Sequence, residues 1–198
     1  MGEKSVQKRK YILDKARSVF ADKGFKDVTM KDIVDACDIS RGGLYLYFSS
    51  TEDVFLAVLE DEIDEDDEEA VVAALSGDAT AGDMLALFLK EQKKEILRKK
   101  NNLTVATYEY FSLHKGSAKD NPLKNQFDTA VRIVEKLIEN GVESGEFYCE
   151  NPVGCARNLM YVVEGLKIAS KTIGVTEEAI DRELMYVLEG LVPDELNN

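Results

Sequence analysis

The fold of this chain is decided by residues 28–48, which read VTMKDIVDACDISRGGLYLYF. Thr29 is a typical N-cap residue, and Asp32 three positions later completes a variant of the capping box. Val28 and Ile33 flank this start as the two halves of a hydrophobic staple. The pattern predicts a short helix that begins at Thr29 and ends near residues 36–37.

A second short helix follows after a tight turn. Ser40 is a good N-cap residue, and Ile39 and Leu44 repeat the staple at the same spacing. Asp38 fits the turn between the two helices, because Asp adopts the left-handed conformation more readily than most residues. The second helix is predicted over Arg41–Tyr47.

A longer helix, over about Lys4–Lys23, precedes the two short ones. Its apolar residues Ile12, Ala16 and Phe20 recur at helical spacing on one face, and Gly24 is a typical residue just past a helix end. Two short helices joined by a tight turn and braced by a longer helix form a helix-turn-helix, predicted here at about residues 29–48.

The second short helix has two different faces. Successive helical residues turn by about 100°, so Leu44, Tyr47 and Phe48 face the other two helices, while Gly42, Tyr45 and Leu46 face outwards. This outward face suits the floor of a DNA major groove, because the two glycines at 42–43 let the backbone approach closely. A tyrosine hydroxyl can reach a phosphate, and an exposed leucine can cover a thymine methyl group.

Charged and polar side chains beside this face add to its chemistry. Arg41 can pair with a guanine or a phosphate, and Thr29 and Lys31 lie at a helix N-terminus that favours phosphate. The basic run at residues 8–10 can neutralise flanking phosphates, although such runs are more often simply solvated. The candidate DNA-binding residues are Thr29, Lys31, Ser40, Arg41, Gly42, Gly43, Tyr45, Leu46 and Tyr47.

Charge is distributed unevenly between the two parts of the chain. The net charge is −13 over 198 residues, yet residues 1–50 hold ten basic and seven acidic residues, a net charge of +3. Residues 51–198 hold 15 basic and 31 acidic residues, a net charge of −16. The first part can approach phosphates while the second is repelled by them, which indicates a division of labour. We therefore predict a DNA-binding domain at 1–50 and a second domain at 51–198.

The second part is predicted to be helical throughout, which makes the fold class all-α. Its long stretches of helix-favouring residues are separated by glycine, proline and capping residues. The predicted helices lie at about Thr51–Leu75, Asp83–Lys99, Leu103–His114, Pro122–Ser144, Pro152–Lys171 and Thr176–Gly190.

Several functional classes find no support in the sequence. Three cysteines stand at positions 37, 149 and 155 without a CxxC spacing, and His114 is the one histidine, so no zinc site of standard spacing is present. Catalytic pairs of base and nucleophile and phosphate-binding loops are also missing, so we expect neither an enzyme nor a cofactor. The charged N-terminus is unlike a signal peptide and no stretch is long enough to cross a membrane, which predicts a soluble cytoplasmic protein.

The stretch from Ile12 to Phe55 resembles the DNA-binding domain of the tetracycline-repressor (TetR) family. The resemblance is carried by Ile12, Ala16, Phe20, Gly24, Phe25, Thr29, Ile33, Ala36, Ile39, Ser40, Gly42, Leu44, Tyr45, Tyr47 and Phe48. Residues 141–147, GVESGEF, followed by Asn151-Pro152, resemble the C-terminal region of that family more loosely. This chain departs from the family pattern at Asp38, Leu46 and Thr51, which leaves the operator sequence open.

The resemblance implies an all-helical homodimer of about nine helices. It implies repression from a palindromic operator in double-stranded DNA, relieved by a small-molecule effector bound in the C-terminal part. It also implies DNA contacts from Thr29, Lys31, Arg41, Gly43, Tyr45 and Leu46. The alternatives are a relative that activates rather than represses, and a helical protein-interaction module that has kept only the fold.

Two further sets of residues lie on the predicted C-terminal helices. Periodicity alone favours an internal core for the apolar stripes on the last two helices, and the resemblance implies that they form the dimer interface: Leu159, Val163, Leu166, Ile180, Leu184, Val187, Leu188 and Leu191. Aromatic residues on candidate pocket helices are candidates for ligand contacts, although such residues more often belong to a core: Phe88, Tyr108, Phe111, Phe127 and Tyr161. The acidic run at residues 60–69, EDEIDEDDEE, is either a cation site or, more simply, a solvated helix face.

Overall fold

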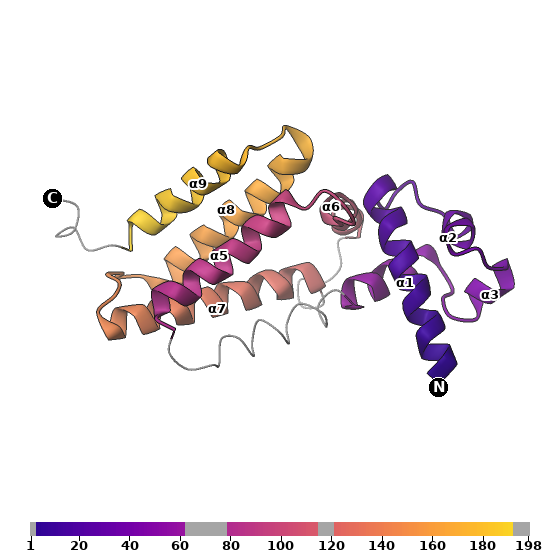
Figure 1. The fold of residues 1–198 in the computed structure, drawn as a ribbon, viewed down its shortest axis with the longest axis horizontal. Coiled ribbons are helices and arrows are strands. Elements are labelled where there is room, and N and C mark those ends of the chain that lie inside the picture. The colour runs from indigo at the N-terminus through magenta and orange to yellow at the C-terminus, as the bar shows by residue number, and fades with distance from the viewer. Residues whose placement is uncertain (1–2, 62–78, 115–120, 192–198) are drawn as a thin grey trace. The chain divides into compact units, whose positions relative to one another are not determined.

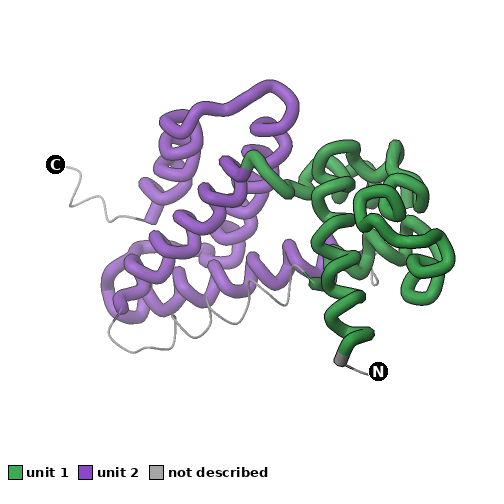
Figure 2. The backbone as a smooth tube through the Cα atoms, turned by 45° about the vertical axis from the view of Figure 1, so that its right-hand side comes forward, with its two compact units in different colours: residues 1–75, 99–115 green, residues 76–98, 116–198 purple. Residues whose placement is uncertain are grey.

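The computed structural model describes residues 3–61, 79–114 and 121–191 (Figure 1). Within these ranges all regular structure is helical, as the sequence predicts. The chain divides into two compact units, coloured separately in Figure 2. Unit 1 comprises residues 1–75 and 99–115, and unit 2 comprises residues 76–98 and 116–198. A functional boundary at residue 50 stays a prediction, since contacts group later residues with the N-terminal helices.

Unit 1 begins with the three helices of the predicted motif. They are α1 (Glu3–Lys23), α2 (Met30–Cys37) and α3 (Arg41–Tyr45). A further helix begins at residue 51 and is described to residue 61, and α6 (Thr104–Leu113) completes the unit.

An aromatic cluster forms the centre of unit 1. Phe20 and Phe55 are fully buried, with ring centroids 4.8 Å apart. Phe25 packs against Phe55 at 5.1 Å and against Tyr110 of α6 at 4.9 Å. Burial of each such side chain stabilises the fold by about 1.5–3 kcal/mol, so α6 is an integral part of this core.

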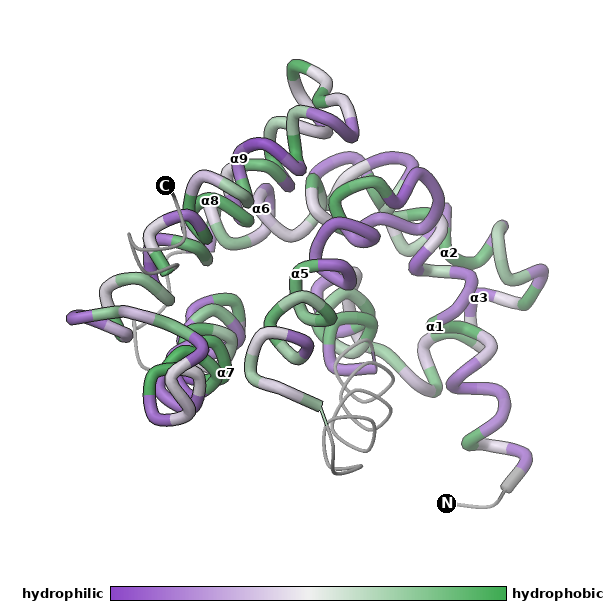
Figure 3. The backbone as a smooth tube through the Cα atoms, turned by 60° about the vertical axis from the view of Figure 1, so that its left-hand side comes forward, coloured by the Kyte–Doolittle hydropathy of each residue, from purple (hydrophilic) through white to green (hydrophobic). Residues whose placement is uncertain are grey.

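The described residues of unit 2 form four helices, α5 (Ala81–Leu97), α7 (Pro122–Ser144), α8 (Pro152–Thr172) and α9 (Glu177–Glu189). Figure 3 shows hydrophobic and hydrophilic residues along each of them, as amphipathic helices require. In this unit α8 packs against α5, α7 and α9. Buried side chains such as Ile138, Val163 and Ile180 form its core.

Most predicted helix limits agree with the structure to within two residues. Asp38 has φ 49° and ψ 51°, which confirms the left-handed turn between α2 and α3. The helix α7 has the predicted limits and ends at Gly145, whose φ is 81°. The predicted helix 51–75 and the acidic run 60–69 lie for the most part outside the described residues.

Three limits differ by two residues, each for a local reason. The helix α5 ends at Leu97 rather than Lys99, because Arg98 has φ −57° and ψ 120°, outside the helical conformation. The helix α5 begins at Ala81 rather than Asp83, because the Thr80 side chain accepts a hydrogen bond from Asp83 N and Asp83 caps the Thr80 N–H in return. The helix α3 ends at Tyr45 rather than Tyr47, because its last turn tightens: Tyr47 N donates to Leu44 O at 2.9 Å. In the described part of the chain, no helix combines the length and apolar character needed to cross a bilayer.

Candidate nucleic-acid interface

The helix α3 is anchored on one face and exposed on the other, as the helical spacing predicts. Leu44 is fully buried and Phe48 nearly so, and both belong to the core of unit 1. On the opposite face the Leu46 side chain is 83% exposed and that of Tyr45 is 44% exposed. A large apolar residue with this exposure contacts water over most of its surface, a cost that a binding partner would remove.

Local interactions fix the start of α3 and the direction of its side chains. The Ser40 hydroxyl accepts a hydrogen bond from Gly43 N at 3.1 Å, which confirms Ser40 as the N-cap. The Arg41 guanidinium lies over the Tyr45 ring, 5.5 Å from its centroid. This cation–π contact holds two exposed candidate residues side by side on one short helix.

The two glycines of α3 differ in their surroundings. A Cβ atom added at Gly42 would meet nothing within 4 Å, so the protein itself has no steric need of a glycine there. A Cβ atom at Gly43 would lie 3.2 Å from the Ser40 Oγ, which is tighter than an ordinary contact. Packing against Ser40 therefore explains why residue 43 is a glycine, while Gly42 leaves open space at the surface.

The N-terminus of α2 carries the other predicted contacts. The Thr29 Oγ1 accepts a hydrogen bond from Asp32 N at 3.3 Å, and Thr29 N donates to Asp32 Oδ2 at 2.8 Å, which confirms the capping box. The Lys23 ammonium, 2.5 Å from Asp32, and the Thr29 donors hold the pKa of the Asp32 carboxyl well below its usual range. Lys31 is exposed beside this cap.

Tyr47 stands apart from the other predicted DNA-binding residues. Its side chain is half-buried and packs against the core of unit 1. The remaining eight are grouped on α2, α3 and the residues that cap these helices, with Leu46 at the C-cap of α3.

Sequence reasoning missed one residue next to this surface, Tyr11 of α1. Its hydroxyl donates to Cys37 O at the end of α2 (3.2 Å), and the Lys8 ammonium lies 4.7 Å from its ring centroid. The Arg9 guanidinium lies 5.4 Å from the Phe48 ring centroid. Two cations of the basic run 8–10 are thus held against aromatic rings. The sequence spacing could have indicated the contact between Lys8 and Tyr11, but not the contact between Arg9 and the distant Phe48.

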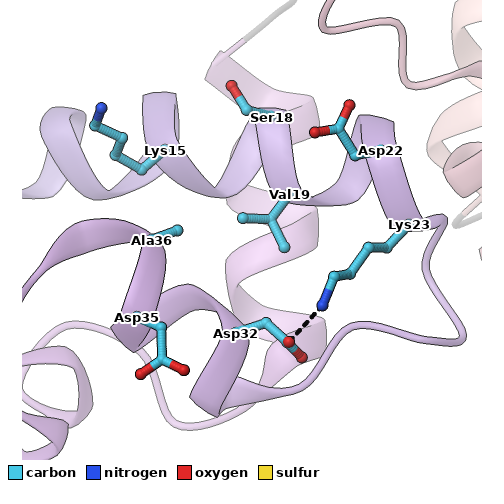
Figure 4. Close-up of a pocket in the computed structure, with 8 residues that line it drawn as sticks. All are labelled: Lys15, Ser18, Val19, Asp22, Lys23, Asp32, Asp35 and Ala36. Carbon is cyan, nitrogen blue, oxygen red and sulfur yellow. Dashed lines mark hydrogen bonds and ion pairs between the residues drawn. The ribbon is translucent and has the colours of Figure 1, made fainter.

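A groove of about 430 Å³ lies between α1 and α2 (Figure 4). The figure shows three carboxylates and two ammonium groups around it, with Lys23 turned towards Asp32. It is lined by Lys15, Ser18, Val19, Asp22, Lys23, Asp32, Asp35 and Ala36. None of the predicted DNA-binding residues lines it, so it is separate from the exposed face of α3.

The predicted dimer residues fall into two groups that differ in how deeply they are buried. Val187 and Leu188 are half-buried against the core of unit 2. The other six are buried within that core, which is the internal alternative left open by their periodicity: Leu159, Val163, Leu166, Ile180, Leu184 and Leu191. Because these six side chains are buried, an interface on α8 and α9 would have to use the half-buried Val187 and Leu188 or other exposed residues.

The structure divides the predicted ligand-pocket residues between the two units. Tyr108 and Phe111 lie on α6 in unit 1, where Phe111 packs against the aromatic core. Phe88 and Phe127 pack against the core of unit 2, and the Phe127 ring lies 5.0 Å from that of the exposed Tyr161. The five aromatic residues therefore do not gather around one cavity within either unit.

A capped, exposed recognition helix on a small helical core defines a class of protein, the helix-turn-helix DNA-binding proteins. Residues 12–58 match the family model of bacterial regulatory proteins of the tetR family. Residues 84–194 match the tetracyclin repressor-like C-terminal domain. The chain belongs to the TetR family of helix-turn-helix transcriptional regulators, a family of DNA-binding regulators and not of enzymes.

Individual relatives agree with this membership. The chain is 32% identical to the HTH-type transcriptional regulator YfiR of Bacillus subtilis over 143 residues, which cover 72% of this chain and 69% of YfiR. It is 40% identical to the HTH-type transcriptional repressor KstR2 of Mycolicibacterium smegmatis over 59 residues, 30% of this chain and 29% of that relative.

Solved structures share the fold over nearly the whole chain. A transcriptional regulator of Saccharomonospora viridis in complex with choline has a TM-score of 0.82 at 19% identity, covering 95% of this chain and 99% of that one. The reduced form of Escherichia coli NemR has a TM-score of 0.78 at 17% identity, covering 94% and 97%.

Proposed function

We propose that this protein is a homodimeric repressor that binds a palindromic operator through α2 and α3 and leaves it when a small molecule binds. The observation that carries the DNA-binding part is the outward face of α3. It combines an apolar side chain, an aromatic hydroxyl, a guanidinium and open space at Gly42 on one small surface. These groups suit base edges, thymine methyl groups and phosphates of a major groove.

Exposed apolar residues on α8 and α9 support the homodimer. Tyr161 and Ile168 are 61% and 40% exposed on α8, and Gly165 between them has nothing within 4 Å of an added Cβ atom. Met185 and Tyr186 are exposed on α9, which packs beside α8. A face of this kind, with a glycine that permits close approach, suits an isologous contact with a second copy.

The names of relatives support the direction of regulation and the effector. KstR2, which matches a short stretch of this chain, is named a transcriptional repressor. A structural neighbour was solved in complex with choline, which is a precedent for small-molecule binding by a regulator of this fold. We accordingly propose repression with release by a small-molecule effector in unit 2.

The test is binding of the full chain to DNA duplexes selected by the purified protein from a random-sequence pool. We expect an inverted repeat to be selected and its affinity to fall as salt rises. Arg41→Ala and Tyr45→Ala should each weaken binding at least about fivefold, the lower range for losing one specific base contact.

Arg132→Ala and Tyr148→Ala are matched controls, because both side chains are exposed in unit 2. They should leave the affinity unchanged. Failure to select any inverted repeat, or full binding by the two α3 variants, would overturn the proposal and favour a helical interaction module. A reporter gene behind the selected repeat distinguishes repression from activation.

A further inference from the structure

A carboxylate from far along the chain closes the turn between α1 and α2. The Glu109 side chain, on α6, accepts hydrogen bonds from Phe25 N at 2.8 Å and from Lys26 N at 3.1 Å, both at Oε2. The two partners are separated from Glu109 by 84 and 83 residues of sequence. Hydrogen bonds to an ionised acceptor are about twice as strong as neutral ones, so this contact is a firm attachment of the turn.

The turn is shaped to receive this carboxylate. Gly24 has φ +76°, a left-handed conformation that turns the following N–H groups towards one point. A Cβ atom at Gly24 would lie 2.6 Å from the Glu109 Oε2, so a larger residue would collide with the carboxylate. Val28 N donates to Phe25 O at 3.4 Å and closes the turn on its other side. Gly24 therefore serves both the backbone conformation and the approach of Glu109.

Glu109 itself is held in place by its neighbours on α6. The adjacent Tyr110 is buried in the core of unit 1, and its hydroxyl donates to Glu52 Oε1 at 2.7 Å. Burial first, and then this contact with Glu52, raise the pKa of Tyr110 to about 12, so the hydroxyl stays protonated as a donor. The helix that carries Glu109 is thus fixed to the same core that supports α1.

The turn leads directly to the DNA-binding residues of α2. Two residues after Lys26, Val28 enters the core, and Thr29 then caps α2 beside the exposed Lys31. A shift of the turn would move this helix N-terminus relative to α1 and α3, and displacements of such contacts by a fraction of an ångström weaken hydrogen bonds to phosphate.

We propose that Glu109 is a positioning residue for DNA binding, which sets the place of the α2 N-terminus by holding the turn at residues 24–26. This inference rests on the proposed DNA-binding function and deepens it. In this role Glu109 contributes to DNA binding from residues 99–115, outside the segment that contains the helix-turn-helix. Glu109 touches no DNA in this role and acts through the backbone of the turn.

The experiment compares full-length Glu109→Ala and Glu109→Gln with the wild type on the inverted repeat that the wild type selects. Stoichiometric titration first gives the fraction of active protein, and the dissociation constant is then measured for the active molecules. A merely structural role lowers the active fraction and the thermal unfolding temperature but leaves that dissociation constant unchanged. Ser18→Ala is the matched control, since it removes another hydrogen bond between α1 and residues 99–115, from Ser18 Oγ to Asn101 Oδ1 at 2.9 Å.

We expect Glu109→Ala to weaken operator binding by about tenfold, the loss of a charge-assisted hydrogen-bond pair. Its salt dependence should be shallower, because fewer phosphates are engaged. Glu109→Gln keeps an acceptor oxygen but loses the charge and should bind about threefold more weakly than the wild type, and Ser18→Ala should bind normally.

Wild-type affinity in Glu109→Ala, or an equal loss in Ser18→Ala, would overturn the positioning role while the DNA-binding function stands. If the wild type itself selects no inverted repeat, the proposed function fails and this inference fails with it. The two failures are therefore distinguishable.

Discussion

Single glycines show which residues serve the fold and which serve something outside it. Gly42 is exposed, and an added Cβ atom there would meet nothing within 4 Å of the protein. We predict that Gly42→Ala leaves stability unchanged or raises it by up to about 1 kcal/mol, because alanine is the better helix former. The same methyl group should weaken operator binding about tenfold or more by holding the backbone of α3 away from the bases.

Thermal unfolding, monitored by circular dichroism, measures the stability of Gly42→Ala. Fluorescence anisotropy measures its affinity for the selected operator. Gly43→Ala is the comparison, since its Cβ atom would press on the Ser40 hydroxyl that caps α3. It should lower stability as well as binding. Full operator affinity in Gly42→Ala would show that α3 does not approach DNA through this backbone.

The Asp32 carboxyl links the capping box of α2 to pH. Its hydrogen bond with Lys23, first, and those with Thr29 depress its pKa in the folded state far below the ordinary value of 3.8. A depressed carboxyl pKa contributes stability that is fully present above the unfolded value and is lost as the pH falls towards the folded value. Asp32→Asn removes this contribution while keeping a side chain of the same shape.

We therefore predict that the wild type unfolds at a higher temperature than Asp32→Asn above about pH 5, and that the difference shrinks as the pH falls below 3.8. Thermal unfolding of both proteins between pH 7 and pH 3 measures it. A difference that is the same at pH 3 as at pH 7 would contradict the assigned role of the ionised carboxyl.

At the scale of helices, local signals in the sequence are enough to place most elements. Thr29, Ser40 and Gly145 act within one turn of their own position, so caps and staples in the sequence predict where α2, α3 and α7 begin or end. The exposed face of α3 follows from the same spacing, because Leu44 and Phe48 must be buried.

Contacts between distant segments lie beyond these local signals. Nothing near Glu109 in the sequence indicates that it binds Phe25 N and Lys26 N, since that pairing depends on how α6 folds back onto α1. The apolar stripes of α8 and α9 could not be divided into core and surface for the same reason. Periodicity predicts that one face is buried but does not say which neighbour covers it.

The packing of residues 141–147, GVESGEF, which span the last turn of α7 and the start of the loop after it, explains their sequence. A Cβ atom at Gly141 would lie 2.0 Å from the Phe147 ring, so the glycine makes room for that ring against α7. Glu146 accepts hydrogen bonds from Gly82 N at 2.9 Å and Ala81 N at 3.3 Å and so holds the N-terminus of α5. The segment therefore joins α7 to α5.

This packing predicts that Gly141→Ala and Phe147→Ala are strongly non-additive. The first substitution should cost about 1–3 kcal/mol of unfolding free energy through steric overlap with the ring. In a Phe147→Ala background the overlap is gone, and Gly141→Ala should then be neutral or stabilising by helix propensity. Urea unfolding of the four proteins in a double-mutant cycle measures the difference, and purely additive costs would refute the contact.

At the scale of the whole molecule, the small size of the exposed face of α3 is the physical reason for the homodimer that we propose. The helix α3 has five residues, and so short a helix reaches only a few base pairs. A symmetric dimer places two such helices roughly one DNA turn, about 34 Å, apart, and binds both halves of an inverted repeat at once. Linking two weak contacts in this way raises the affinity far above that of either one.

We expect that one charge on the exposed apolar face of α8, around Tyr161 and Ile168, prevents two copies of the chain from associating. Ile168→Glu places a carboxylate on this exposed face of α8. Ile133→Glu on α7 is the matched control, because the two isoleucines are 40% and 46% exposed. Sedimentation equilibrium should give twice the chain mass of 22.1 kDa for the wild type and Ile133→Glu, and the single mass for Ile168→Glu. Ile168→Glu should also lose the advantage of the full repeat, binding it no more than about twofold better than one half-site, since a monomer gains only a second equivalent place to bind. If Ile168→Glu stays dimeric while Ile133→Glu dissociates, the interface lies on α7 rather than on α8. If both variants remain dimeric and bind DNA with full affinity, the exposed face of α8 is not the dimer interface, and the two copies associate through another surface.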